Sequence, residues 1–380
     1  MAFPRFLFCA IALAGLLQSG AIFAASPKCV AWPDWNNFRS RFLSGDGRVI
    51  DHGSMSDITT SEGQAYSMFF ALVANDRTRF DLILKWTTNN LAKGNLSDRL
   101  PAWQWGKRPD GSWAVMDDNA ASDADLWMAY SLTEAGRLWK DPSYAKVGRA
   151  LSLRILDEET ATLDKLGRTL LPGPRSFHLP DDVYRLNPSY YPIQLMRRLA
   201  AAYPETQWDQ VVTTSINALL QSSEKGYAPD WVLYKNKLGF MPDKEKKAVG
   251  SYDAIRVYLW AGMLAENDPA RAALIKKLNP MTEHVLKNGI PPLEVNTQDA
   301  STRGYGPIGF SSAILPFIAT SKQKNLVEQQ RLRVVNAQPL ERWDNYYEQV
   351  LTLFGTGWLE KRFKFDKDGK LVTNWNCHPD

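Results

Sequence analysis

One arrangement occurs three times along this chain: a hydroxyl residue, then an acidic residue, then a run with helical spacing. The three copies begin at Ser61-Glu62, Ser122-Asp123 and Ser251-Tyr252-Asp253. In the first copy the apolar positions have the period of one helix face, at Ala65, Met68, Phe69, Leu72 and Val73. Hydroxyl residues at the start, among them Thr59 to Ser61, are typical N-caps. A carboxylate in a first turn commonly only complements the helix dipole, which is worth about 0.3–1 kcal/mol. Because the arrangement is repeated, we expect parallel helices whose first turns bring carboxylates to one rim.

The helical period continues in pairs of segments along the rest of the chain. The first member of each later pair is more apolar, and the second carries more Lys, Arg and Glu. A helix that is apolar nearly all round is buried, whereas a helix with one polar face lies outside. We predict inner helices over residues 61–73, 122–139, 188–203, 251–265, 310–319 and 344–354. We predict outer helices over residues 35–43, 77–91, 144–156, 208–220, 269–278 and 322–335.

Six inner and six outer helices in alternation indicate an all-α fold, an (α/α)6 barrel. Four connections from an outer to the next inner helix are long, at residues 93–120, 157–187, 222–250 and 279–309. Loops of this length in a compact domain are usually functional or contain short strands. Because they precede inner helices, we expect them to open on the rim that carries the carboxylates.

The N-terminus has the features of a secretory signal peptide. Arg5 precedes an apolar run over residues 6–17, and small residues follow at Ala24 and Ala25. We therefore predict a signal peptide over residues 1–25 and a single catalytic domain over residues 26–380. The apolar run is short for a membrane span, so the protein is not expected to be embedded in a membrane. Of the cysteines, Cys29 and Cys377 remain after cleavage; a disulfide between them and two separate thiols are both compatible with the sequence.

Composition narrows the range of functions. The formal charge is +4 over 380 residues and the basic residues form no stripe, so nucleic acid is not an expected partner. Four histidines stand far apart without a HExxH or Cys/His cluster, so neither a metal site nor a cofactor is predicted. Fourteen Trp and fourteen Tyr supply many flat rings with polar edges, which suit the binding of amphipathic ligands as well as core packing.

An acidic cleft lined with aromatic residues fits glycoside hydrolysis, which needs one carboxylic acid and one carboxylate. The chain resembles glycoside hydrolase family 8, and within it the endoglucanases of bacterial cellulose-synthesis operons. The resemblance covers essentially all of the mature chain. It rests on six motifs, at residues 59–64 (TTSEGQ), 100–106 (LPAWQWG), 121–125 (ASDAD), 187–190 (NPSY), 251–257 (SYDAIRV) and 350–355 (VLTLFG).

The resemblance implies an (α/α)6 barrel and hydrolysis of β-1,4-glucan with inversion. Glu62 matches the general acid of the family, and Asp253 matches the residue assigned as base. Asp123 matches the signature aspartate, which is interpreted as a contact to the sugar at the cleavage point. Arg256 matches the arginine one helical turn after the base, and its charge favours an ionised Asp253.

Aromatic residues in the motifs are candidate sugar platforms, because ring faces stack on the apolar faces of glucose. We expect this role for Trp103, Trp105 and Tyr190, and a substrate contact for Tyr252 next to Asp253. Asp125 is expected to be a structural cap.

The sequence thus predicts a periplasmic or secreted endo-β-1,4-glucanase that acts on cellulose during its synthesis and export. Its partners would be the glucan chain and the cellulose synthase or export complex. Two alternatives stay open: a related specificity for xylan or chitosan, and a glucan-binding subunit without turnover.

Overall fold

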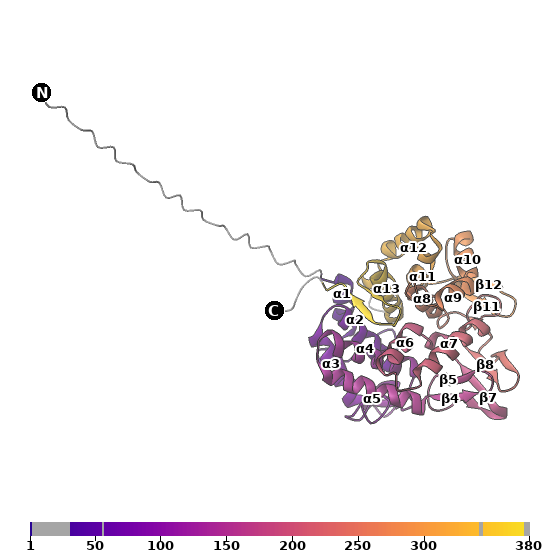
Figure 1. Cartoon of the computed structure of the whole chain (residues 1–380), viewed down its shortest axis with the longest axis horizontal. Helices are drawn as coiled ribbons and strands as arrows, with labels where there is room; N and C mark the ends of the chain where they lie inside the picture. Colours follow the sequence, from indigo (N-terminus) through magenta and orange to yellow (C-terminus); the bar gives the residue numbers. More distant parts are fainter. Residues whose placement is uncertain (2–30, 55–56, 342–344, 376–380) are drawn as a thin grey trace. The chain divides into compact units, whose positions relative to one another are not determined.

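The computed structural model describes Met1 and residues 31–54, 57–341 and 345–375 (Figure 1). Contacts group residues 31–374 into one compact unit. The predicted signal peptide, apart from Met1, and both Cys29 and Cys377 lie outside the described residues. Within the described part of the chain, no helix combines the length and apolar character needed to cross a bilayer.

Six of the described helices form the inner ring, and each contacts the next one along the chain. In Figure 1 the colours run from indigo through magenta and orange to yellow, and α13 returns to α1 and α2. The ring closes at Phe354, whose ring centroid lies 4.6 Å from that of Phe70 and 5.1 Å from that of Tyr66. The inner helices are α2 (Ser61–Val73), α4 (Ser122–Leu138), α6 (Ile193–Ala202), α8 (Ile255–Met263), α11 (Ile308–Ile318) and α13 (Tyr346–Leu359).

The remaining described helices cover the ring from outside. Glycines let two inner pairs approach closely: a Cβ added to Gly262 would lie 2.3 Å from the nitrogen of Phe317, and one on Gly355 would lie 1.9 Å from the Ser312 carbonyl oxygen. The ring of inner helices and the outer helices around it confirm the predicted (α/α)6 barrel. The outer helices are α1 (Pro33–Phe42), α3 (Arg77–Asn90), α5 (Pro142–Glu158), α7 (Trp208–Ser222), α9 (Arg271–Leu278), α10 (Pro280–Asn288) and α12 (Lys324–Ala337).

Three predicted helices differ from the observed ones. The helix predicted from residue 188 begins only at Ile193, because Pro192 disfavours helical geometry at the residue before it; a 3-10 turn at Pro188–Tyr190 comes first. The helix predicted over 251–265 is shorter, α8, and residues 251–254 form a turn ahead of it. One outer position holds two helices, since Pro280 opens α10 directly after α9.

All four long connections contain short antiparallel strands, as predicted. The strand β1, just ahead of α2, pairs with the first of them, and a C-terminal hairpin follows α13. The strands are β1 (Thr59–Thr60), β2 (Gln104–Lys107), β3 (Trp113–Asp117), β4 (Thr160–Leu163), β5 (Gly167–Leu170), β6 (His178–Leu179), β7 (Val183–Leu186), β8 (Val232–Lys235), β9 (Gly239–Pro242), β10 (Val249–Gly250), β11 (Pro292–Asn296), β12 (Thr302–Tyr305), β13 (Phe363–Phe365) and β14 (Leu371–Thr373).

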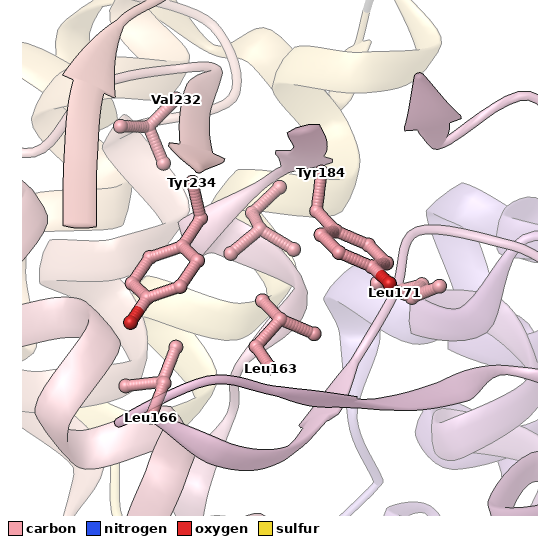
Figure 2. Packing of buried hydrophobic residues seen from close by; sticks show 7 residues of the cluster. Leu163, Leu166, Leu171, Tyr184, Val232 and Tyr234 are labelled. Atoms are coloured by element: carbon pink, nitrogen blue, oxygen red, sulfur yellow. The ribbon is translucent and has the colours of Figure 1, made fainter. Parts of the chain in front are cut away.

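The sheet β6–β9 rests on its own small core (Figure 2). Tyr184 from β7 and Val232 and Tyr234 from β8 pack with Leu163 and Leu166 of the β4–β5 hairpin. The hydroxyl of Tyr234 donates a hydrogen bond to the carbonyl of Asp164 at 2.5 Å. This cluster fixes the start of β8 to the body of the protein.

Candidate active site

Glu62 is placed by the first turn of α2. The hydroxyl of Thr60 accepts a hydrogen bond from the Gly63 nitrogen at 3.0 Å, so Thr60 is the N-cap. The Ser61 nitrogen donates to the Trp103 carbonyl at 2.9 Å, which ties this start to the chain leading into β2. The Glu62 side chain is 22% exposed, whereas all other residues of α2 are buried. The helix therefore presents this single carboxyl group at its open end.

Asp123 lies in the first turn of α4, beside Glu62. Ser122 does not cap this helix, contrary to the prediction: the cap position is Ala121, without a side-chain hydrogen bond. The Ala124 nitrogen instead donates to Asp123 Oδ1 at 2.8 Å. Asp123 is 4% exposed. Burial raises its pKa to about 7, the Glu62 carboxylate adds to the rise, and Arg256 opposes it.

Asp253 lies in the turn before α8 and not, as predicted, in the first turn of the helix. The predicted cap Ser251 points elsewhere, donating its hydroxyl to the Leu293 carbonyl at 2.7 Å. Asp230 takes over the capping: its Oδ1 accepts from the nitrogens of Ser251, Asp253 and Ala254 at 2.7, 3.1 and 2.7 Å. Burial, with a further contribution from Asp253, raises the pKa of Asp230 to about 6.

Arg256 joins the starts of α2 and α8. Its Nη1 donates to Glu62 Oε1 at 2.5 Å, and its Nη2 donates to Asp253 Oδ1 at 2.8 Å and to the Ser189 hydroxyl at 2.9 Å. The guanidinium is buried, with 6% of the side chain exposed. Each carboxyl group thus gives one oxygen to Arg256 and keeps its second oxygen for another partner.

Two tyrosine rings flank the guanidinium. The Cζ of Arg256 lies 5.9 Å from the ring centroids of both Tyr190 and Tyr347. Burial raises the pKa of both phenols, so both stay protonated as hydrogen-bond donors. The Tyr347 hydroxyl donates to the Tyr252 carbonyl at 2.5 Å, and Tyr252 itself is 51% exposed. Tyr190 therefore lies against the guanidinium that binds both carboxylates, and Tyr252 directly precedes Asp253 and is held by Tyr347.

The two tryptophans of the LPAWQWG motif have different surroundings. The Trp103 backbone lies between the starts of α2 and α4, because its carbonyl binds Ser61 and its nitrogen donates to the Asn119 carbonyl at 2.8 Å. Trp105 stacks on Trp113 with centroids 5.4 Å apart and contacts Trp86 edge-on at 5.3 Å. The Arg48 guanidinium lies 4.5 Å from the Trp105 ring centroid. The ring of Trp105 thus packs within the β2–β3 hairpin region.

Asp125 is not a cap, contrary to the prediction. It is fully buried, as is Glu159 at the end of α5. Burial raises the pKa of both carboxyl groups. Asp123 adds to the rise at Asp125, where a hydrogen bond from Glu159 opposes it, and Asp125 adds to the rise at Glu159.

A hollow of about 720 Å³ lies beside the β2–β3 hairpin, and its lining includes Asp117, Asp118 and Glu158. It is bordered by Ala102 and Ala120, which flank Trp103 and the ASDAD motif, and by the charged side chains of Arg108 and Arg175. Glu62, Asp123 and Asp253 are not among its lining residues, so we place the chemistry at Arg256 and not in this hollow. In the described ranges, no three His, Cys, Asp or Glu side chains gather in a set that could hold a metal ion.

Sequence reasoning missed Asp230, Tyr347 and the contact of Arg256 with Glu62. The only local signal for Arg256 was its position three residues after Asp253. Asp230 lies 23 residues before Asp253 in a long loop, and no periodicity or cap pattern singles it out. Tyr347 stands in a predicted inner helix whose rim residues could have been considered as site residues.

A protein-family model described as "Glycosyl hydrolases family 8" matches residues 10–361. An endoglucanase of Escherichia coli (strain K12) is 46% identical over 358 residues, which cover 93% of this chain and 94% of that protein. An endoglucanase of Xanthomonas axonopodis pv. citri (strain 306) is 43% identical over 96% of this chain and 94% of that protein.

The fold is also similar to those of solved structures. The endo-1,4-D-glucanase from Vibrio fischeri ES114 superposes with a TM-score of 0.87 and 43% identity, covering 90% of this chain and 99% of that one. A reducing-end-xylose releasing exo-oligoxylanase superposes with a TM-score of 0.66 over 86% of this chain and 90% of that one, at 18% identity. The second likeness is one of fold alone.

Proposed function

This chain belongs to glycoside hydrolase family 8, and we propose that it is an endo-β-1,4-glucanase that cleaves cellulose chains with inversion. One observation carries the proposal: Arg256 holds Asp253, three residues before it, and Glu62, 194 residues before it, on a single guanidinium. Relatives at 43–46% identity over more than nine-tenths of the chain are endoglucanases, which supports glucan as substrate.

The two carboxyl groups have complementary roles in this proposal. Glu62 donates a proton to the glycosidic oxygen as the bond between that oxygen and the anomeric carbon breaks. Asp253 accepts a proton from a water molecule whose oxygen forms the new bond on the opposite face of the sugar. Arg256 orients one oxygen of each group, which leaves the second oxygen of each for the reaction. Asp123 contacts the sugar at the cleavage point, where its raised pKa allows it to donate a hydrogen bond near neutral pH.

Inversion makes a direct prediction about the product. An inverting pair of carboxyl groups stands about 6.5–9.5 Å apart to admit the water, whereas a retaining pair stands about 5–5.5 Å apart. The first product released should therefore be the α-anomer. Proton NMR during the first turnovers on a cello-oligosaccharide distinguishes the anomers, and an initial β-anomer would exclude Asp253 as the base.

The aromatic residues around the site suit sugar stacking to different degrees. We propose that Trp103, Tyr190 and Tyr252 contact the glucan, because each lies beside one of the helix starts. The Arg48 Cζ lies 4.5 Å from the Trp105 ring centroid and 4.9 Å from that of Trp113, so Arg48 and Trp113 contact Trp105 from one side. We therefore propose Trp105 as a sugar platform as well. Trp103→Ala and Trp105→Ala should each raise KM for cello-oligosaccharides through lost stacking, while the fold stays intact.

Specificity is tested by one set of assays. Release of reducing sugar from carboxymethylcellulose, xylan and chitosan by the purified protein should be largest for carboxymethylcellulose. A preference for xylan or chitosan would favour the related specificities instead. No turnover on any of the three would favour a glucan-binding subunit, which the coupled Glu62 and Asp253 speak against.

We further propose that the protein acts in the periplasm or outside the cell, on cellulose during its synthesis and export. The signal-peptide pattern over residues 1–25 supports this location. Cell fractionation that finds the full-length chain in the cytoplasm would contradict it. Copurification with the cellulose synthase or export complex from membranes would identify that complex as a partner.

A further inference from the structure

We infer that Asp230 is a positioning residue for the base, holding the turn that carries Asp253 in its working position. The inference rests on the proposed role of Asp253. Its basis is geometric: Oδ1 of Asp230 accepts hydrogen bonds from three backbone nitrogens, those of Ser251, Asp253 and Ala254.

These three donors have no capping side chain from their own segment. The position before α8 is Ala254, which makes no side-chain cap, and the Ser251 hydroxyl donates to Leu293. The first N–H groups of a helix lack partners within the helix, so they are satisfied from outside or remain unpaired. Asp230 supplies one oxygen to all three, and the nitrogen of Asp253 is among them.

Asp230 is itself fixed to rigid structure on both sides. Its nitrogen donates to the Val249 carbonyl at 2.8 Å, just ahead of the turn. Two residues later, Val232 is 5% exposed and packs in the cluster of Figure 2 with Leu163 and Tyr184. These contacts anchor the backbone of Asp230, and the three hydrogen bonds to Oδ1 hold its carboxylate against the turn.

The position of Asp253 matters because a general base must reach the proton of the attacking water. A displacement of about 1 Å at a catalytic group can lower the rate about 10²-fold. Arg256 fixes one oxygen of the Asp253 side chain, while Asp230 fixes its backbone nitrogen. The two contacts together define where the second oxygen of Asp253 lies.

The positioning role needs a hydrogen-bond acceptor and not a negative charge. Asparagine has the same shape and an equivalent Oδ1, and it is as good a helix cap as aspartate. Alanine removes the acceptor, and glutamate keeps the charge but displaces it by one methylene group. The three variants Asp230→Asn, Asp230→Ala and Asp230→Glu therefore separate geometry from charge.

The experiment measures kcat and KM of these variants on two substrates: a cello-oligosaccharide, and an aryl cello-oligosaccharide whose acidic phenol leaves without protonation. We expect Asp230→Ala to lower kcat about 10²-fold on both substrates, with little change in KM. Asp230→Asn should stay within about threefold of wild type, because the acceptor remains. Asp230→Glu should lose at least about tenfold, because its oxygen cannot reach all three nitrogens in place.

Asp141→Ala is the matched control. Asp141 caps the outer helix α5 through the Ser143 nitrogen at 3.0 Å and pairs with Arg77, and neither partner belongs to the site. Its loss should lower the melting temperature and leave kcat unchanged. If Asp230→Ala does not fold, Asp230→Asn and Asp230→Glu still decide, since equal impairment of both overturns the inference.

Two references separate this inference from the proposed function. Wild type must turn over glucan, and Asp253→Asn must be slower by about 10²–10⁴. If wild type fails, the proposed function is contradicted; if Asp253→Asn keeps its rate, the role of Asp253 as base is contradicted. If both references hold and Asp230→Ala keeps the wild-type kcat, only the positioning role of Asp230 is overturned.

Discussion

The starts of α2 and α8 both carry a proposed catalytic carboxyl group, but they hold it in different ways. At α2 the cap Thr60 lies two residues before Glu62, and its partner Gly63 lies one residue after it. At α8 the cap is Asp230, 23 residues before Asp253, and it spans the whole turn. One start is built from adjacent residues and the other depends on a distant loop. A catalytic group of the second kind is sensitive to changes far from it in sequence.

The largest expected effect comes from replacing the carboxyl groups at the starts of α2 and α8, which have different chemical roles. Glu62→Gln removes leaving-group protonation and Asp253→Asn removes water activation, so each should lower kcat on cello-oligosaccharides by about 10²–10⁴. An aryl substrate with an acidic phenol needs no protonation, so Glu62→Gln should regain most of the lost rate and Asp253→Asn should not. Rates of both variants on both substrates test this.

Binding serves as the control for that experiment. Both variants should bind cello-oligosaccharides with nearly wild-type affinity in calorimetry, because only the reacting groups have changed. Recovery of Asp253→Asn on the aryl substrate would show that Asp253 is not the base.

The next effect concerns the side chain that links the two starts. Arg256→Met removes the donors to both Glu62 and Asp253 and should lower kcat about 10²-fold, as the loss of other preorganised donors does. Arg256→Lys should be intermediate, because a single ammonium cannot bridge two carboxylates as a planar guanidinium does.

Arg149→Lys is a suitable control for Arg256, since Arg149 forms an exposed pair with Glu205 at 2.8 Å. It should leave kcat unchanged. An Arg256→Lys variant with full activity would mean that charge alone, and not the bridging geometry, organises the two starts.

The barrel could be predicted from the sequence because the spacing of apolar residues within each segment indicates a helix. The inner helices are apolar around their circumference, and the outer ones have one polar face, as in α2 and α12. The exceptions have local steric causes, such as Pro192 at the start of α6 and Pro280 between α9 and α10.

The site was only partly predictable for a related reason. The pair Asp253 and Arg256 follows from a spacing of three residues on one turn. The contact of Arg256 with Glu62 joins residues 194 apart, which the closed ring brings together. Asp230 reaches the α8 turn from 23 residues earlier, through the fold of one long loop. The packing of Trp105 against Trp86 and Trp113 likewise depends on tertiary structure, which its motif alone does not predict.

Asp123, at the start of α4, should make the stability of the protein depend on pH. The pKa of Asp123 is raised to about 7 in the folded protein, so the folded state binds more protons than the unfolded state between about pH 4 and 7. The free energy of unfolding should therefore fall as the pH rises from about 4 to 7, because ionising the buried Asp123 carboxyl group destabilises the folded state. Asp123→Asn removes the penalty and should be more stable than wild type at pH 8, by a few kcal/mol at most.

Urea unfolding of wild type and Asp123→Asn at pH 5 and pH 8 measures the difference. Asp141 has its pKa lowered, first by the Ser143 hydroxyl, so it is ionised in both the folded and the unfolded state at pH 5 and at pH 8. Asp141→Asn should therefore change the free energy of unfolding by the same amount at both pH values. Equal stability differences at both pH values would show that Asp123 is not held protonated in the folded state.

The smallest expected effect tests whether the position of Glu62 depends on the neighbouring cap residue Thr60. Thr60→Ala removes the cap and should lower the free energy of unfolding by about 0.5–2 kcal/mol, while Thr60→Ser keeps the hydroxyl and should cost much less. Glu62 is also held by Arg256, and the Ser61 nitrogen is held by Trp103, so the carboxyl group should stay in place without the cap. We therefore expect kcat of Thr60→Ala to remain near wild type, in contrast to Asp230→Ala. A fall in kcat as large as that of Asp230→Ala would mean that both starts depend on their caps to place the catalytic group, and the distinction between a local and a remote start would then have no consequence for catalysis.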